Sequence, residues 1–140
     1  MSSVLDETDE FRLELNSEPT LVRKTVRDLL KHIDDCVPAS ESLDDLRLIF
    51  SELLYNAVIH GNKKEPGKRV LVQLKTRSDR VYVSIEDEGP GYDYNRLMEY
   101  ARSDAALMDE GGRGMVLVCA LTENLKFNEA GNQVCFEVRL

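Results

Sequence analysis

The segment SELLYNAVIHGN carries three polar side chains four residues apart: Glu52, Asn56 and His60. On an α-helix this spacing places them along one side, beside an apolar stripe. Asn is a poor helix former and a buried amide costs free energy unless it is paired, so Asn56 is an odd choice for stability alone. A carboxylate and an amide one turn apart can share a Mg²⁺ ion, or act as base and metal ligand. The alternative is that Glu52 and Asn56 are ordinary polar residues at the rim of a buried face.

A second segment, VYVSIEDEGPGYD, ends an expected strand on a carboxylate. Asp87 falls on the same face as the apolar residues of that strand, where an unpaired carboxylate is costly. Gly89 and Gly91 follow at once, and glycine allows the backbone to approach a ligand closely. Such a carboxylate suits hydrogen bonds from a planar, amino-bearing base such as adenine. The alternative is a solvated Asp87 at a strand end that runs into a Gly-Pro-Gly turn.

A third segment, EGGRGMVLV, places Gly111, Gly112, Arg113 and Gly114 ahead of an apolar run. Glycines before a helix leave backbone N–H groups at its positive end, which suits phosphate binding. The segment is not a P-loop, because no Gly-Lys-Ser/Thr follows, and it is not a dinucleotide fingerprint, because no GxGxxG joins a strand to a helix. Each glycine cluster is weak on its own.

The elements that would position these segments follow from apolar periodicity and turn residues. Ser17 is predicted to cap the first helix, with Pro19 in its first turn. Residues 93–110 form a mixed polar stretch with some helical character. The predicted elements are a strand at residues 11–15, helices over 17–33 and 42–61, strands at 70–75 and 81–87, a helix after 114, and a hairpin of 125–128 with 133–140.

This order of elements predicts the fold class. Because the strands cluster in hairpins, we expect an α+β fold, a two-layer α/β sandwich with helices packed on one face of a mixed, mostly antiparallel sheet. A chain of 140 residues is too short for two ordinary domains. We therefore assign residues 1–10 to a flexible acidic lead-in and residues 11–140 to one domain.

Composition excludes several classes of function. The net charge of −8 argues against sequence-independent binding of nucleic acid, which needs clustered Lys and Arg. No apolar run approaches the ~20 residues that cross a bilayer, and the first residues lack the pattern of a secretory signal. The two histidines and three scattered cysteines show no zinc-binding spacing. We expect a cytoplasmic protein with no direct nucleic-acid or membrane partner.

The three segments together, ExxxNAxxHGN, DxGxG and GGxG in this order, resemble the motifs of the histidine-kinase-like (GHKL) ATPases. Within that group the chain looks most like the stand-alone anti-sigma-factor serine kinases of bacterial sporulation and stress responses. The resemblance covers residues 11–140. It implies the histidine-kinase-like ATPase fold, with ATP and Mg²⁺ as cofactors.

The resemblance also implies roles for individual residues. Glu52 matches the general base and Asn56 matches the magnesium ligand. Sensor histidine kinases resemble this helix but usually carry an amide one turn before the magnesium ligand, so Glu52 favours the serine kinases. Asp87 matches the residue that binds the adenine amino group, with Gly89 and Gly91 shaping the pocket.

At the phosphates, Gly112 and Gly114 match the family's glycines, Gly111 and Arg113 lie beside them, and residues 94–110 match the ATP lid. The chain departs from the family at one place. Members usually have an arginine just ahead of these glycines, where this chain has MDE. Arg113 and Arg102 are the nearest basic residues, and the first is our preferred source of a cation for the terminal phosphate.

The function that the resemblance implies is an ATP-dependent serine-protein kinase and anti-sigma factor. It would phosphorylate an anti-anti-sigma factor and sequester a sigma factor, and so regulate transcription. The alternative is a nucleotide-dependent binding switch with weak or no phosphotransfer. A detached histidine-kinase catalytic domain fits less well, because of Glu52 and the lack of a helical phospho-acceptor segment. The resemblance is also compatible with a homodimer.

Overall fold

Five antiparallel strands form the sheet in the part of the chain that the structure describes. The computed structural model describes residues 8–91, 98–99 and 110–140, with only the backbone of residues 110–113. The strands lie in the order β1-β2-β3-β5-β4, and all four pairings between described residues are antiparallel. The sequence predicts a mixed, mostly antiparallel sheet; the antiparallel pairing is confirmed, and the described strands form no parallel pair. The strands are β1 (Thr8–Asn16), β2 (Arg69–Arg77), β3 (Arg80–Glu86), β4 (Glu123–Phe127) and β5 (Gln133–Arg139).

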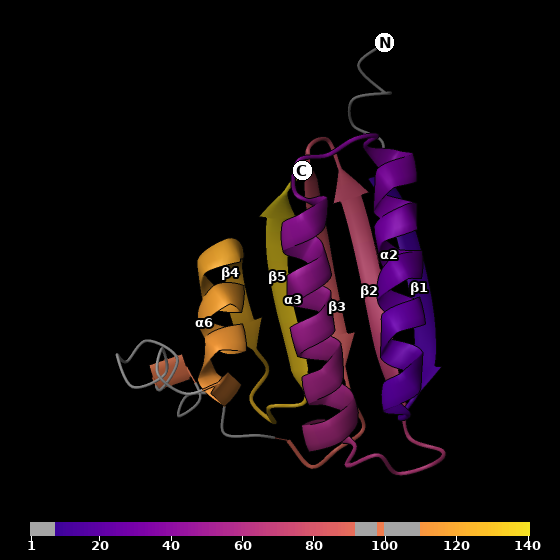
Figure 1. Cartoon of the computed structure of the whole chain (residues 1–140), viewed down its shortest axis with the longest axis vertical. Helices are drawn as coiled ribbons and strands as arrows, with labels where there is room; N and C mark the ends of the chain where they lie inside the picture. Colours follow the sequence, from indigo (N-terminus) through magenta and orange to yellow (C-terminus); the bar gives the residue numbers. More distant parts are fainter. Residues whose placement is uncertain (1–7, 92–97, 100–109) are drawn as a thin grey trace.

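Three helices cover one face of this sheet, as Figure 1 shows, so the predicted two-layer α+β fold is confirmed. They are α2 (Val22–Cys36), α3 (Leu43–Tyr55) and α6 (Glu110–Leu121), and α3 lies between the other two. A short 3-10 turn, Pro19–Leu21, precedes α2. Among the described helices, none combines the length and apolar character needed to span a membrane.

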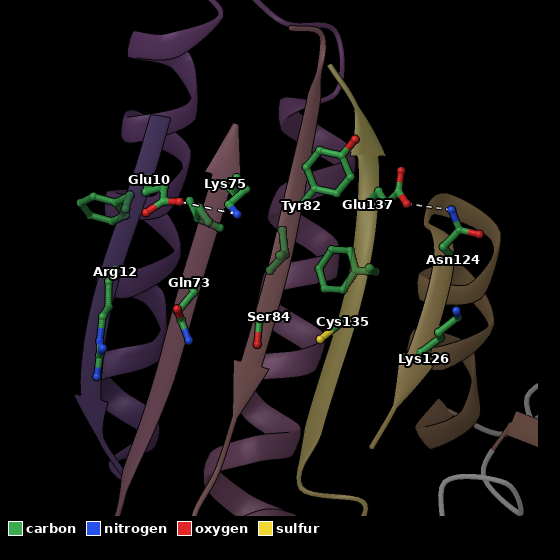
Figure 2. Close-up of a pocket in the computed structure, with 14 residues that line it drawn as sticks. Glu10, Arg12, Gln73, Lys75, Tyr82, Ser84, Asn124, Lys126, Cys135 and Glu137 are labelled. Atoms are coloured by element: carbon green, nitrogen blue, oxygen red, sulfur yellow. Dashed lines mark hydrogen bonds and ion pairs between the residues drawn. The ribbon is translucent and has the colours of Figure 1, made fainter. Parts of the chain in front are cut away.

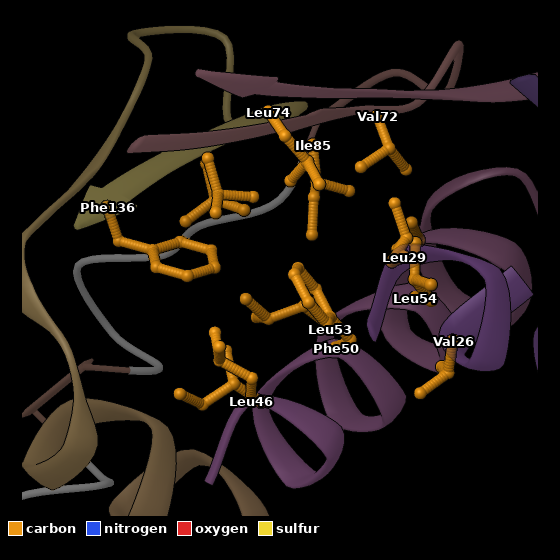
Figure 3. Close-up of a cluster of buried hydrophobic side chains, with 14 of the residues drawn as sticks. Val26, Leu29, Leu46, Phe50, Leu53, Leu54, Val72, Leu74, Ile85 and Phe136 are labelled. Carbon is orange, nitrogen blue, oxygen red and sulfur yellow. The ribbon is translucent and has the colours of Figure 1, made fainter. Parts of the chain in front are cut away.

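The core lies between the helix layer and the sheet. Apolar residues recur on one side of α2 and α3 at helical spacing, and alternate residues of β2, β3 and β5 pack against them from the sheet. Burying these side chains is the main favourable term for the fold. Figure 3 shows the meeting of the two layers through Val26 and Leu29 of α2, Leu46, Phe50, Leu53 and Leu54 of α3, and Val72, Leu74, Ile85 and Phe136 of the sheet.

Three predicted boundaries are corrected. The first strand begins at Thr8, so it includes three residues that we assigned to the lead-in. Ser17 does not cap a helix, because its hydroxyl donates a hydrogen bond of 2.7 Å to the carbonyl of Lys68, far along the chain. The last helix begins at Glu110, so Gly111 and Gly112 lie in its first turn and not ahead of it.

Candidate functional site

The helix that carries Glu52, Asn56 and His60 changes from α-helical to π-helical winding at Asn56. α3 continues from Tyr55 into a π-helical segment, Asn56–Gly61, and the N–H of Asn62 closes it on the carbonyl of Ala57 at 2.8 Å. The predicted end near Gly61 is therefore confirmed, although the last six residues are not α-helical. π-helical segments are rare and occur frequently at functional sites, because the wider turn displaces side chains from the α-helical pattern.

Glu52 and Asn56 lie on neighbouring turns of this helix, beside α6. Glu52 is half-buried, and burial raises the pKa of its carboxyl group, while the charge of His60 and a hydrogen bond from Asn56 oppose the rise. The amide nitrogen of Asn56 also lies 3.6 Å from the sulfur of Met115 on α6. A carboxylate with a raised pKa is a better proton acceptor near neutral pH than an exposed one.

Gly114 of α6 brings the third motif to this carboxylate. A β-carbon added at Gly114 would overlap the Glu52 carboxylate, so the lack of a side chain is what lets the two helices approach here. The structure therefore joins Glu52, Asn56 and the glycine segment, which lie far apart in the chain. The first-turn N–H groups of a helix have no partner within it, and those of Gly111 and Gly112 are among them. The side chain of Arg113 lies outside the described part of the chain, as do Arg102 and the predicted lid except residues 98–99 and the backbone of Glu110.

Asp87 is the buried carboxylate of the site, with a residue exposure of 5%. Its Oδ1 accepts a 2.8 Å hydrogen bond from the N–H of Gly89, and its own N–H donates to the carbonyl of Asn132 at 2.9 Å. Burial raises the pKa of Asp87 and the charge of Glu86 adds to it, whereas the Gly89 N–H opposes the rise. Among the described residues, only the Gly89 N–H donates to the carboxylate. This leaves Oδ2 to accept a hydrogen bond from a ligand.

Glycines make room on both sides of Asp87. A β-carbon at Gly61 would overlap the Asp87 carboxylate, and one at Gly89 would overlap the carbonyl oxygen of Gly61. Gly91 has a φ of +99°, and a β-carbon there would overlap the carbonyl oxygen of Ala130 in the β4–β5 turn. The glycine turn is thus pressed between the end of the π-helical segment and the last hairpin.

Asn62 holds this arrangement together and was not predicted as a site residue. It is fully buried, and its amide nitrogen donates to the hydroxyl of Ser17 at 2.8 Å and to the carbonyl of Arg69 at 3.0 Å. Its amide oxygen accepts from the N–H of Glu88 at 2.7 Å. One side chain therefore ties the end of β1, the start of β2 and the turn after Asp87 to the helix end. The sequence offers only an Asn after a helix-ending Gly, which is an ordinary helix stop.

Replacing Asn62 by Ala is expected to lower the free energy of unfolding by about 2–4 kcal/mol, because three hydrogen bonds are lost and buried donors and acceptors remain unpaired. Urea denaturation followed by circular dichroism measures the change. Asn16→Ala is the matched control, since Asn16 is exposed at the end of β1 and should change stability by less than about 0.5 kcal/mol. Equal stability of Asn62→Ala and the control would contradict the role of Asn62 in tying these segments together.

A separate pocket with a volume of about 870 Å³ lies on the open face of the sheet, opposite the helices (Figure 2). Side chains of β1, β2, β3, β4 and β5 line it, among them Gln73, Tyr82, Ser84 and Glu137. None of its lining residues belongs to the three motifs. The motif residues meet instead on the helix side, where α3 ends and α6 begins.

The comparisons with known proteins agree with this geometry. The profile of the family described as "Histidine kinase-like ATPase domain" matches residues 15–138. An anti-sigma F factor of Lysinibacillus sphaericus is 27% identical over 114 residues, which cover 81% of this chain and 76% of that protein. The serine-protein kinase RsbW of Listeria innocua is 30% identical over 91 residues, 61% of this chain and 58% of that protein.

A solved structure shows the same fold. The mycobacterial sensor histidine kinase MprB superposes with a TM-score of 0.52 over 96% of this chain and 97% of its own, at 16% sequence identity. At that identity the likeness concerns the fold alone. The family profile spans all three motifs and most of the chain, and the chain therefore belongs to the histidine kinase-like ATPase domain family.

Proposed function

We propose that the protein is a Mg-ATP-dependent serine kinase that also acts as an anti-sigma factor. In this proposal it phosphorylates an anti-anti-sigma partner and sequesters a sigma factor in the cytoplasm. The observation that carries the kinase activity is the half-buried Glu52, one turn before Asn56 and against Gly114 of α6. The names of its relatives, an anti-sigma F factor and a serine-protein kinase, support the same function.

Glu52 is assigned the role of general base. A serine hydroxyl is a weak nucleophile until its proton is removed. Glu52 accepts this proton as the serine oxygen bonds to the terminal phosphorus of ATP, and the bond from that phosphorus to the bridging oxygen breaks to leave ADP. Burial raises the pKa of Glu52, which makes its carboxylate a better proton acceptor than that of an exposed glutamate.

Asn56 is assigned to the magnesium ion that accompanies ATP. Its amide nitrogen is directed to the sulfur of Met115, which leaves the amide oxygen as the atom suited to Mg²⁺. When bound, the ion would neutralise part of the negative charge of the phosphates. The N–H groups in the first turn of α6, at Gly111 and Gly112, are the proposed donors to the phosphates.

The adenine amino group is assigned to Asp87. The Gly89 N–H already donates a hydrogen bond to Oδ1 of Asp87, so Oδ2 is the proposed acceptor for the adenine amino group. A side chain at Gly61 would collide with this carboxylate and one at Gly89 would collide with the carbonyl of Gly61, so glycine at both positions supports a close approach of the backbone to Asp87. Gly91 is proposed to shape the same pocket, because its backbone packs against Ala130 in the last hairpin.

The experiment that tests this function is co-purification from the native cell in ATP and in ADP, with mass spectrometry of what binds. The expected result is two partners, one of which is phosphorylated on serine by the purified protein and Mg-ATP. Retention of partners without any phosphorylation would instead support the second candidate function, the nucleotide-dependent binding switch. The acidic MDE segment ahead of the glycines is the observation that favours it.

Arg113→Ala is expected to slow phosphotransfer while leaving ADP affinity unchanged, because ADP lacks the terminal phosphate on which charge builds up. Single-turnover phosphorylation and calorimetric titration with ADP measure the two effects. Arg102→Ala is the companion variant, since Arg102 is the second candidate cation. If the wild type transfers phosphate rapidly and neither variant slows it, the partner supplies the cation for the terminal phosphate.

We also propose a homodimer, on the resemblance to the anti-sigma kinases. Size-exclusion chromatography with light scattering is expected to give twice the chain mass of 15.9 kDa. A monomer at all concentrations would contradict this part of the proposal and leave the kinase assignment intact.

A further inference from the structure

A second cluster of reactive side chains lies at the other end of the molecule. In Figure 1 the start of β1 and the end of α2 lie at one end of the molecule, and α3 reaches its π-helical end at the opposite one. There, Asp9 of β1 meets His32 and Cys36, which are one turn apart on α2. One ligand atom from each of the three residues lies within 4.8 Å of the other two.

The spacing of two of these atoms fits a tetrahedral zinc ion. A sulfur at about 2.3 Å and a nitrogen at about 2.0–2.1 Å from such an ion lie about 3.6 Å apart. The sulfur of Cys36 lies 3.6 Å from Nε2 of His32. The third donor, Oδ2 of Asp9, hydrogen-bonds the same nitrogen at 2.5 Å and must withdraw by less than about 1 Å to become a ligand. The Asp9 side chain is 47% exposed, so it has room to do so.

Neighbouring residues hold the donors in place. The imidazole of His32 stacks on Phe11 of β1, with ring centroids 4.1 Å apart and an interplanar angle of 18°. This contact directs Nε2 towards Asp9 and Cys36. Thr76 of β2 is the cross-strand partner of Asp9.

The hydroxyl of Thr76 is the second observation that points to a ligand. Thr76 is 5% exposed, and its Oγ1 is buried without a hydrogen-bond partner in the described part of the chain. A buried hydroxyl left unpaired costs about 1–3 kcal/mol. Thr76 pairs with Asp9 across β1 and β2, so the two side chains lie next to each other on the same face of the sheet. A thiolate at Cys36 would give it an acceptor.

We propose that Asp9, His32 and Cys36 bind one Zn²⁺ ion, with water as the fourth ligand and the Thr76 hydroxyl donating to the Cys36 thiolate. A mixed set of oxygen, nitrogen and sulfur donors suits zinc, whereas Mg²⁺ prefers oxygen alone. The site is therefore distinct from the magnesium site proposed at Asn56. It ties the start of β1 to the end of α2. The sequence shows no zinc spacing because Asp9 and His32 are 23 residues apart and only the fold joins them.

The test uses the full chain without an affinity tag, reduced by a phosphine and free of nucleotide. Zinc is titrated in competition with a chromogenic chelator, and Co²⁺ is added separately to detect a thiolate-to-cobalt charge-transfer band. The expected result is one zinc per chain and a cobalt–thiolate band. Cys36→Ser and His32→Gln should each weaken zinc binding by more than the roughly 10–100-fold typical of losing a residue that only supports a ligand.

Two further variants separate the site from general effects. Thr76→Val removes only the hydroxyl and should weaken zinc binding about 10–100-fold, without destabilising the metal-free protein, because that hydroxyl is unpaired there. Cys135→Ser is the matched control, since Cys135 is exposed on the open face of the sheet and should bind as wild type does.

Zinc should also raise the unfolding midpoint of the wild type and of Cys135→Ser, but not that of His32→Gln. Absence of the cobalt–thiolate band in the wild type would overturn the proposal, and so would wild-type zinc affinity in Cys36→Ser. If the Cys36 variant does not fold, unchanged zinc affinity in Thr76→Val together with an unchanged midpoint shift in His32→Gln would overturn it equally.

Discussion

Glu52→Gln is expected to slow transfer of phosphate from ATP to serine by about 10²–10⁴-fold, the usual contribution of a positioned base. The Gln side chain keeps the size of the residue and fits the same space beside Gly114, but it cannot accept the hydroxyl proton. Affinity for Mg-ATP should stay nearly unchanged, because Glu52 is assigned to the proton and not to the nucleotide. Single-turnover phosphorylation and calorimetric titration with Mg-ATP measure the two quantities.

Two other variants sharpen this result. Asn56→Ala should instead weaken magnesium-dependent nucleotide binding, because the amide oxygen is the proposed ligand of the ion. Glu41→Gln is the control for loss of one negative charge, since Glu41 is exposed in the loop before α3. A Glu52→Gln protein that phosphorylates its partner at the wild-type rate would show that Glu52 is not the base.

The pH dependence gives an independent readout of the same role. A base must be deprotonated to act, so the wild-type rate should fall as pH drops through the pKa of Glu52. Burial raises that pKa, so the fall should begin above the usual range of a glutamate carboxyl. The residual activity of Glu52→Gln should lack this step.

The parts of the fold that the sequence predicts are those set by local periodicity. The apolar stripes of α2 and α3 and the alternation in β2, β3 and β5 each place one face towards the core, and the elements follow from that. The errors fall where a distant partner overrides a local signal. Ser17 next to Pro19 has the pattern of a helix cap, but the carbonyl of Lys68 takes its hydroxyl. Residues 8–10 look like an acidic tail, but they pair with β2, and Lys75 forms a 3.5 Å ion pair with Glu10.

The candidate site divides in the same way. Glu52 and Asn56 are close because four residues separate them on a helix, and sequence spacing is enough to predict that. The contact of Glu52 with Gly114 depends on how α6 packs on α3, and the clamp at Asn62 depends on three segments that meet only in the folded chain. Neither has a local signal, so neither was predicted. The proposed zinc ligands belong to this second group.

Asp87→Asn is expected to change ATP affinity and stability in opposite directions. Asn can keep the hydrogen bond from Gly89 through its Oδ1, but it offers an N–H where the adenine amino group needs an acceptor. Mispairing one buried polar group should weaken ATP binding by about 1–3 kcal/mol. Calorimetric titration with ATP measures this loss, and equal affinity of variant and wild type would sink the assignment of adenine to Asp87.

The stability of the same variant should rise at neutral pH. Burial raises the pKa of Asp87 in the folded state, so ionising this carboxyl costs stability as pH rises from its unfolded pKa through its folded pKa. Asp87→Asn removes that cost. Its advantage in urea denaturation should therefore be full at neutral pH and disappear in acid, where the wild-type carboxyl is protonated. Asp28→Asn, at an exposed position of α2, controls for the change in net charge and should show no such pH dependence. A carboxylate that destabilises the free protein but strengthens ATP binding is what a binding residue, and not a structural one, should show.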